Sequence, residues 1–343
     1  MQDMTPGLRS GKLPAAALEA MLARLPRRDP RVLVGPRPGE DAAVIDVGGG
    51  RSIVVATDPV TFATDRIGSY AVHVNANDVA VMGAAPRWLF LVLLLPAGRA
   101  DTAMLDAIMS DVVGACEALG VTLCGGHTEI TGGLDRPVAI GQMIGEVDHD
   151  RLVRKESARP GDAVILAGAA AVEGTAILAR EKRAELLASS LPPGLLDRAA
   201  AFLDDPGISV VRAALAAAAT GVVRGMHDPT EGGIATGLLE LAAAAGLGIA
   251  VDGERIPVMP ETAAVCGALA VDPLRLIASG ALLVAAPPAQ APHLVQILRG
   301  LAIPAEVVGE IREPSHGATI TFGGRPRPLE LPPRDELARL LSP

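Results

Sequence analysis

The sequence is poor in aromatic residues and in cysteine, and each shortage excludes a class of protein. Half of the 343 residues are hydrophobic, but aromatics make up only 2%, so the apolar mass is aliphatic and suits α/β layers. A hydrophobic share of this size excludes an intrinsically disordered chain, which could not bury enough apolar surface to offset its ordering entropy. The three cysteines include no CxxC pair, which argues against a disulfide framework or a zinc site and indicates a reducing compartment.

Long apolar runs and basic clusters are also missing. The longest apolar run, at positions 88–96, is far shorter than the roughly 20 residues that span a bilayer. The amino-terminal segment MQDMTPGLRSGK contains no apolar stretch of the signal-peptide type. The net charge is −9, and no basic face of the kind that binds nucleic acid is visible. We therefore expect a cytoplasmic protein that binds neither membranes nor nucleic acid.

The common phosphate-binding motifs are absent as well. Neither GxxxxGK[ST] nor a GxGxxG that follows a strand occurs, so a nucleotide-binding chain of this sequence would be neither a P-loop nor a Rossmann protein. Lysine occurs only at Lys12, Lys155 and Lys182. An anionic substrate would then have to be neutralised by metal ions and backbone amides.

Strand-like and helix-like segments alternate in both halves of the chain, which predicts two α/β or α+β domains. We expect a helical lead at 1–34, an N-terminal domain at 35–150, a C-terminal domain at 160–325 and a tail at 326–343. The charged stretch DHDRLVRKESARPG at 148–161 is interpreted as the linker between the domains. The pattern further predicts helices at 68–83, 101–119 and 234–245, a strand at 88–95 that is buried on both faces, and a glycine-rich turn directly after the strand that begins at 121.

Two acids in the N-terminal half are placed as metal ligands often are. Asp41 lies in a loop that enters a strand, and Asp58 lies where the next strand ends. Hard cations such as Mg²⁺ take one or two protein carboxylates, and phosphates and water complete their coordination. The alternative is that either acid only caps a turn through its own backbone.

The predicted helix at 68–83 carries three polar residues, Asn75, Asn77 and Asp78, among small apolar neighbours. Asn and Asp are poor residues for a helix interior because their side chains compete for backbone hydrogen bonds. Asn75 and Asp78 are three positions apart and share one helix face. This pattern indicates either a binding site or an ordinary solvated face.

Two glycine-rich segments follow. In Cys124-Gly125-Gly126-His127-Thr128-Glu129 the glycines permit close approach of backbone amides to a ligand, and His127 and Glu129 project the same way. His127 is either a phosphate contact or a structural histidine. In His227-Asp228-Pro229-Thr230-Glu231-Gly232-Gly233 a helix begins, and its amides could hold an anion. Asp228 or Thr230 is the expected N-cap of that helix.

Six motifs in collinear order resemble the aminoimidazole ribonucleotide (AIR) synthase superfamily. They are GEDAAVI, ATDP, NDVAVMGAAP, GGHTE, RPGDAVILAG and HDPTEGG, and they span nearly the whole chain. NDVAVMGAAP and DPTEGG are the most specific of them. The superfamily includes thiamine-monophosphate kinase, selenide water dikinase and the hydrogenase-maturation factor HypE, and the HypE-like group is the nearest match.

The resemblance implies a two-domain α/β fold, a homodimer whose N-terminal sheets join into a barrel, and a cleft that binds ATP and Mg²⁺. It implies metal binding by Asp41, Asp58, Asp78 and Asp228, and catalytic roles for Asp58 and Asp228. Together with the glycine-rich segments, it implies cofactor binding by Asp58, Asn75, Gly125, Gly126, His127, Thr128, Thr230, Gly232 and Gly233.

The function that this resemblance implies is ATP- and Mg²⁺-dependent activation of an oxygen atom of a small molecule by phosphoryl transfer. HypE acts on a carbamoyl group carried by its own C-terminal cysteine, whereas the last cysteine here is Cys266 and the sequence given ends in ARLLSP. The family acid is replaced by His127 in GGHTE. A non-catalytic nucleotide-binding scaffold for a maturation partner protein, a kinase similar to thiamine-monophosphate kinase and a structural dimer with a vestigial site are the alternatives.

Overall fold

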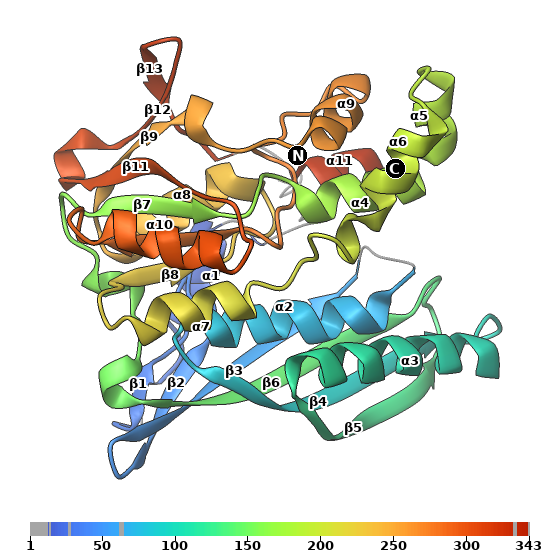
Figure 1. The fold of residues 1–343 in the computed structure, drawn as a ribbon. Coiled ribbons are helices and arrows are strands. Elements are labelled where there is room, and N and C mark those ends of the chain that lie inside the picture. Colours follow the sequence, from blue (N-terminus) through green and yellow to red (C-terminus); the bar gives the residue numbers. More distant parts are fainter. Residues whose placement is uncertain (1–12, 14, 27–28, 62–64, 332–334, 342–343) are drawn as a thin grey trace, which may run out of the picture.

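The computed structural model describes residues 13, 15–26, 29–61, 65–331 and 335–341. Two β-sheets lie in separate layers, and helices fill the space between them (Figure 1). The predicted two-domain α/β architecture is confirmed. The N-terminal lead and the tail were predicted as 1–34 and 326–343, and the parts of them at 1–12, 14, 27–28, 332–334 and 342–343 lie outside the described residues.

The first sheet has six strands in the order β1-β2-β3-β6-β4-β5. Their bounds are Val32–Val34 for β1, Ala43–Gly48 for β2, Arg51–Val60 for β3, Ala85–Pro96 for β4, Thr122–Thr131 for β5 and Val138–Asp148 for β6. All neighbours are antiparallel except β4 and β5. The prediction that β4 is buried on both faces was wrong, because exposure alternates along it and Phe90 is 38% exposed. Helices cover one face of this sheet only, which explains the alternation.

Two long helices cover that face, α2 (Ile67–Val81) and α3 (Thr102–Leu119), as predicted from the apolar periodicity. Gly141 of β6 lets α2 approach the sheet closely. A Cβ atom there would lie 2.4 Å from Asn75 Nδ2 and 2.7 Å from the carbonyl oxygen of Ala71. The glycine therefore sets the height at which the polar residues of α2 sit above the sheet.

The second sheet has seven strands in the order β13-β12-β9-β11-β7-β10-β8. Their bounds are Ala163–Ala167 for β7, Gly225–His227 for β8, Gly248–Asp252 for β9, Leu282–Ala286 for β10, Ala305–Arg312 for β11, Ala318–Phe322 for β12 and Arg325–Pro328 for β13. Every residue of β7, β8 and β10 is buried, so this part of the sheet is covered on both faces. β10 runs antiparallel to both neighbours, so the carboxyl ends of β7 and β8 meet at one edge.

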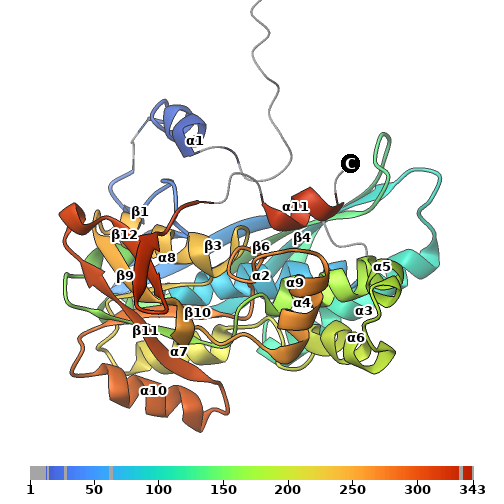
Figure 2. The same cartoon turned by 90° about the horizontal axis from the view of Figure 1, so that it is seen from above.

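The remaining helices surround the second sheet and the space between the layers. They are α1 (Ala15–Leu22), α4 (Val172–Glu181), α5 (Arg183–Ala188), α6 (Pro193–Ala200), α7 (Val211–Ala219), α8 (Gly233–Ala244), α9 (Pro260–Ala268), α10 (Ala291–Gly300) and α11 (Glu336–Leu341). One apolar core cluster contains residues of both sheets, including Val54 of β3 and Ile165 of β7. Seen from above, α11 lies beside the region of α4 and α9 (Figure 2). None of the described helices is long and apolar enough to cross a membrane.

The predicted linker at 148–161 connects the two sheets. It contains two short 3₁₀ turns, His149–Arg151 and Lys155–Ser157, and is followed by β7. Although this stretch is rich in charge, Lys155 is almost completely buried. The linker therefore places one of the three lysines of the chain inside the protein.

Candidate active site

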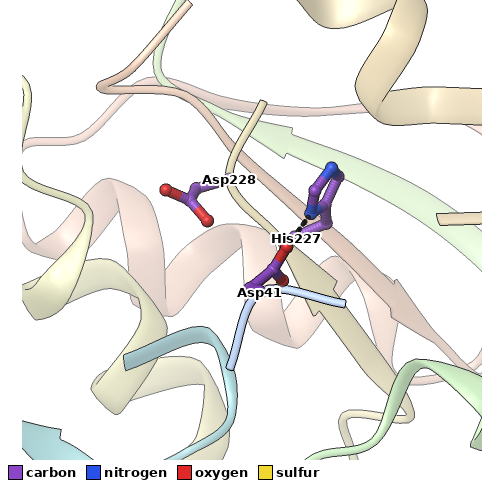
Figure 3. A group of neighbouring side chains, drawn as sticks. All are labelled: Asp41, His227 and Asp228. Atoms are coloured by element: carbon purple, nitrogen blue, oxygen red, sulfur yellow. Dashed lines mark ion pairs between the residues drawn. The ribbon is translucent and has the colours of Figure 1, made fainter. Parts of the chain in front are cut away.

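A buried network of charges joins the loop before β2 to the second sheet. Lys155 Nζ donates to Asp41 Oδ2 at 2.8 Å and also to the carbonyl oxygen of Gly39. His227, the last residue of β8, places Nδ1 2.9 Å from Asp41 Oδ1 and Nε2 2.9 Å from Glu240 Oε2 on α8. Figure 3 shows the imidazole ring of His227 facing Asp41, with the Asp228 carboxyl group beside this pair. Asp41 thus has a cationic partner at each oxygen.

The electrostatics of the network follow from these contacts. Burial alone would raise the pKa of Asp41, but the adjacent His227 and Lys155 outweigh burial and hold this pKa below its ordinary value. Burial would likewise lower the pKa of His227, but the Asp41 carboxylate raises it to about 9. His227 is therefore protonated at neutral pH, and both of its ring nitrogens donate hydrogen bonds. A protonated imidazole has no lone pair to offer a metal ion.

Two further acids, Asp78 of α2 and Asp228 after β8, are buried beside this network without such partners. Among the described residues, nothing hydrogen-bonds to Asp78 Oδ2 or to either carboxyl oxygen of Asp228. Burial, then the charges of Asp228 and Asp58, raise the pKa of Asp78 well above its ordinary value. Burial, then the charge of Asp41, raises the pKa of Asp228 in the same way. The structure thus brings the four predicted acids together, each from a different segment.

Asn75 fixes the position of Asp58 rather than lying on a solvated face. Its Oδ1 accepts from the backbone N–H of Asp58 at 2.8 Å, and its Nδ2 donates to the carbonyl oxygens of Asp58 and Ala71 at 3.3 and 2.9 Å. Asn77, on another face of α2, fixes a different backbone segment. Its Nδ2 donates to the carbonyl oxygen of Ile208, and its Oδ1 accepts from the backbone N–H of Val210. The alternative of a solvated face was wrong, because Asn75 and Asn77 are fully buried and Asp78 is buried too.

The turn between β8 and α8 differs from the prediction. Neither Asp228 nor Thr230 is the N-cap of α8; the cap is Gly232, whose φ of 77° favours glycine, and no side chain of that residue closes the helix. Instead, the carboxylate of Asp335 accepts from the Gly232 N–H at 3.1 Å. The side chain of Asp228 is thereby free of a capping role, and the carbonyl oxygen of Thr230 accepts from Gly233 and Ala278.

The GGHTE segment lies apart from the four acids. The expected glycine-rich turn is wrong, because β5 continues through these residues to Thr131. Gly126 is required by the pairing of β5 with β4, where a Cβ atom would lie 1.7 Å from the carbonyl oxygen of Leu91. Two strands separate β5 from β3, so Gly126 lies about 14 Å from Asp58 across the sheet.

The side chains of that segment are exposed on the edge strand. His127 Nε2 lies 3.7 Å from Glu129 Oε2, so the two side chains do project the same way. Gly125 and Thr128 share this exposed strand. The roles predicted for Gly125, Gly126, His127 and Thr128 in cofactor binding stay predictions.

Sequence reasoning missed Lys155 and Glu240, and it missed the position of His227. Lys155 lies in a stretch that reads as a solvated linker, and Glu240 lies seven residues into a helix. The sequence offered a partial signal for Lys155 and His227. The chain has only three lysines, and His227 directly precedes Asp228. Their association depends on three segments that are remote in sequence.

The donor set fits a hard divalent cation. Asp78 and Asp228 offer buried carboxylate oxygens without hydrogen-bond partners, and oxygen ligands of this kind are those that Mg²⁺ takes in proteins. Asp58 lies beside Asp78 and adds a third carboxylate. Among the described residues, three ligand atoms lie within 4.8 Å of one another only at Asp41, His227 and Asp228. Within this group Asp41 and His227 pair with each other, and the carboxyl group of Asp228 lies beside them.

The fold and this group of acids define a two-domain protein of the AIR synthase type. The family model for the N-terminal domain of AIR synthase related proteins matches residues 39–147, and the model for their C-terminal domain matches residues 159–321. Together the two models cover most of the chain, which therefore belongs to the AIR synthase related family.

Similar proteins include several HypE proteins. The chain is 33% identical to carbamoyl dehydratase HypE of Cupriavidus necator over 289 residues, which cover 81% of this chain and 78% of that protein. It is 31% identical to selenide, water dikinase of Nitratidesulfovibrio vulgaris over 75% of this chain and 72% of that one. A crystal structure of the hydrogenase maturation protein HypE shares the fold with a TM-score of 0.72 at 26% identity and covers 91% of this chain and 97% of its own.

Proposed function

We propose that the protein binds Mg²⁺ and ATP beside Asp58, Asp78 and Asp228 and activates an oxygen atom of a small molecule by phosphoryl transfer. The observation that carries the proposal is the pair of buried carboxyl groups at Asp78 and Asp228 with unpartnered oxygens. Such a pair is costly to fold unless a cation compensates for it when the protein works.

In this proposal the acids have different tasks. Asp78 and Asp228, with Asp58 beside them, hold the metal ions, which neutralise charge on the phosphates when bound. Asp41 acts as an anchor, because both of its oxygens already face cations. Asn75 orients the backbone at Asp58. The acceptor oxygen attacks the γ-phosphorus, the bond to the β,γ-bridging oxygen breaks, and ADP leaves.

The relatives support this chemistry. The name carbamoyl dehydratase describes the loss of water from a carbamoyl group, and removal of a carbonyl oxygen is easier once phosphorylation makes it a better leaving group. A dikinase at 31% identity transfers phosphoryl groups by its name. A HypE solved in complex with ATP shares the fold, with a TM-score of 0.71.

The three described cysteines are not placed to carry an acceptor group. Cys116 and Cys266 are buried, and burial raises the pKa of these thiols to about 11 and about 12. Neither is a reactive thiolate at neutral pH. Cys124 is exposed, but on the edge strand β5, away from the four acids. Within the described residues, no cysteine is placed to carry a substrate into this site. The three free thiols also support a place in the reducing cytoplasm.

Calorimetric titration with ATP in the presence of Mg²⁺ tests the proposal. We expect one Mg²⁺-dependent site per chain, and we expect Asp58→Ala and Asp78→Ala to weaken it by at least about tenfold. Asp106→Ala, an exposed position on α3, is the matched control. Absence of binding, or binding that the two site variants leave unchanged, would refute the proposal.

A scaffold that binds nucleotide without turnover is the second candidate. A HypE was solved in complex with HypF at 25% identity to this chain, so a maturation partner protein of this kind is a reasonable partner here. Phosphate release measured with and without such a partner distinguishes the phosphoryl-transfer enzyme from the scaffold. Stable binding without turnover under both conditions would favour the scaffold.

We further propose that two copies pair through β5. All but one of its residues are exposed, including Leu123 and Ile130, and long exposed edge strands invite pairing with another chain. Pairing of copies would also bring the GGHTE segment to a new neighbour. Light scattering should give twice the mass of one chain for the wild type. For Ile130→Asp the measured mass should fall to that of a single chain. A wild-type monomer at all concentrations would refute the dimer.

A further inference from the structure

A surface cavity of about 460 Å³ lies between α2, α3 and the segment that leads into α7, and the proposed phosphoryl transfer does not use it. At the start of α2 its wall contains Arg66, Ser69 and His73, which follow one another at helical spacing. Asn75 and Asp78 lie on the opposite face of the same helix. The cavity is therefore separate from the proposed phosphoryl site, and its size suits a small molecule.

Close packing and small residues shape the cavity. A Cβ atom at Gly68 would clash with the carbonyl oxygen of Ile108, so α2 and α3 touch there. Farther along α3, Gly114 and Ala118 line the cavity and leave it open because their side chains are so small. The third wall, next to α7, is held by the hydrogen bonds of Asn77 described above. The walls are thus fixed by packing and hydrogen bonds within the folded protein.

The charges in the cavity are paired with one another. Arg66 donates to both carboxyl oxygens of Asp204, at 2.9 and 3.3 Å, and its Nε lies 3.2 Å from Asp111 Oδ1. Two carboxylates thus surround one guanidinium group. An anionic ligand would meet both carboxylates, and a cationic ligand would have to compete with Arg66 for them. The cavity therefore favours a neutral molecule.

His73 supplies an uncharged hydrogen-bonding group in the same wall. Burial, and then the charge of Arg66, lower the pKa of His73 to about 4, so the ring is neutral at neutral pH. Its Nδ1 is buried and has no hydrogen-bond partner among the described residues. A buried N–H without an acceptor is costly, so the proton belongs on Nε2. The ring therefore brings an Nε2–H donor to the cavity that it lines.

We propose that the cavity binds a neutral polyhydroxy compound, a molecule with several hydroxyl groups and no charge. A hydroxyl group both donates and accepts, so one can accept from His73 while others donate to the carboxylates of Asp111 and Asp204. The hydroxyl groups of Ser69 and Ser209 line the same cavity and can pair with a ligand hydroxyl in either direction. The inference does not rest on the proposed function, because the two sites lie on different faces of α2.

myo-Inositol is the probe, because it is neutral and carries a hydroxyl group on every ring carbon. Cyclohexanol has the same carbon ring with a single hydroxyl group, and a monophosphate of myo-inositol adds negative charge. NMR of the histidine ring signals locates the binding, and the signal of His73 is the one that His73→Phe lacks. We expect myo-inositol to shift this signal and to bind at least about fivefold more tightly than either counterpart.

Two variants test the contacts by calorimetry. His73→Phe keeps a ring of similar shape but removes the donor, and it should weaken myo-inositol binding by about three- to tenfold. Ala118→Leu should narrow the cavity and weaken binding by about tenfold or more. Ala107→Leu is the matched control, since this exposed position on the same helix lies outside the cavity, and it should leave the affinity unchanged.

The inference is overturned if myo-inositol does not shift the His73 signal, or if cyclohexanol or the phosphate binds equally well or better. Equal affinity of the wild type and His73→Phe would overturn it too. Thermal unfolding shows whether each variant is folded, and Mg²⁺-dependent ATP binding should be the same in all of them. A protein that binds myo-inositol at His73 but does not bind ATP would refute the proposed function and leave this site standing.

Discussion

Lys155 Nζ lies 2.8 Å from Asp41 Oδ2, and the two side chains are 1% and 7% exposed. This ion pair ties the segment between the sheets to the loop that enters β2. His227 adds a second cation from the other sheet. Asp41 is therefore a junction of three segments, and its charge is balanced within the protein.

Lys155→Met should destabilise the protein by about 3–5 kcal/mol, because removal of one partner of a buried pair leaves the other charge poorly compensated. His227 remains as a partner, so the lower end of this range is expected. Chemical denaturation measures the effect. Lys182→Met removes a partly exposed lysine that pairs with Glu185 at 3.4 Å and should change the free energy of unfolding by less than about 1 kcal/mol. Equal effects of the two variants would contradict the anchoring role of Asp41.

Asn75→Ala should cost about 1–3 kcal/mol of stability, since it leaves the backbone groups of Asp58 without their partner in a partly buried position. It should also weaken Mg²⁺-dependent ATP binding, because Asp58 loses its fixed orientation. Denaturation and calorimetry on the same preparation measure both effects. If stability falls while ATP affinity is unchanged, Asn75 does not position Asp58 for binding.

Gly141→Ala tests the close approach of α2 to β6. The new methyl group would meet Asn75 Nδ2 and the Ala71 carbonyl, so we expect a loss of about 1–3 kcal/mol from overpacking. Gly114→Ala on α3 is the matched control, since a Cβ atom there has no neighbour within 4 Å. Alanine in a helix interior should stabilise that variant by up to about 1 kcal/mol. If Gly141→Ala leaves the free energy of unfolding unchanged, α2 is not held close to β6 by this glycine.

The stability of the protein should depend on pH through Glu173. Its pKa rises from 4.5 to about 7 on folding, so the folded state binds an extra proton between these values. The contribution of this group to stability is therefore present below pH 4.5 and is lost as the pH rises to 7, by about 3 kcal/mol in total. The charges of Glu231 and Asp335 add to this rise in pKa, and Ser279 opposes it.

Glu173→Gln should remove this dependence. The difference in the free energy of unfolding between variant and wild type should grow by about 3 kcal/mol from about pH 4.5 to about pH 8. Other titrating groups cancel in the difference. A constant difference over this range would show that Glu173 is not perturbed by folding.

Local rules predicted most of the elements. Apolar periodicity placed α2 and α3, and the C-cap of α3 is Gly120 in the left-handed conformation. The exceptions have physical reasons. Exposure alternates along β4 because helices cover only one face of its sheet. α8 begins at a glycine because the carboxylate of Asp335, more than a hundred residues away, accepts a hydrogen bond from the Gly232 N–H at the amino end of the helix.

The sequence indicated which acids belong together, but it could not show what neutralises them. Asp41, Asp58, Asp78 and Asp228 were grouped by motif, and the structure brings them together. That Asp41 is paired while Asp78 and Asp228 are not depends on where Lys155 and His227 fold. Such a distinction rests on tertiary contacts, and no local pattern carries it.

The central claim is that Asp78 is a buried acid kept for a metal–nucleotide ligand at a cost in stability. Thermal unfolding of the wild type and Asp78→Asn, each with and without Mg²⁺ and ATP, tests it most directly. We predict that Asp78→Asn raises the melting temperature of the free protein, and that Mg²⁺ with ATP stabilises the wild type but not the variant. A variant that is less stable when free and is stabilised by Mg²⁺ and ATP as much as the wild type would contradict the claim.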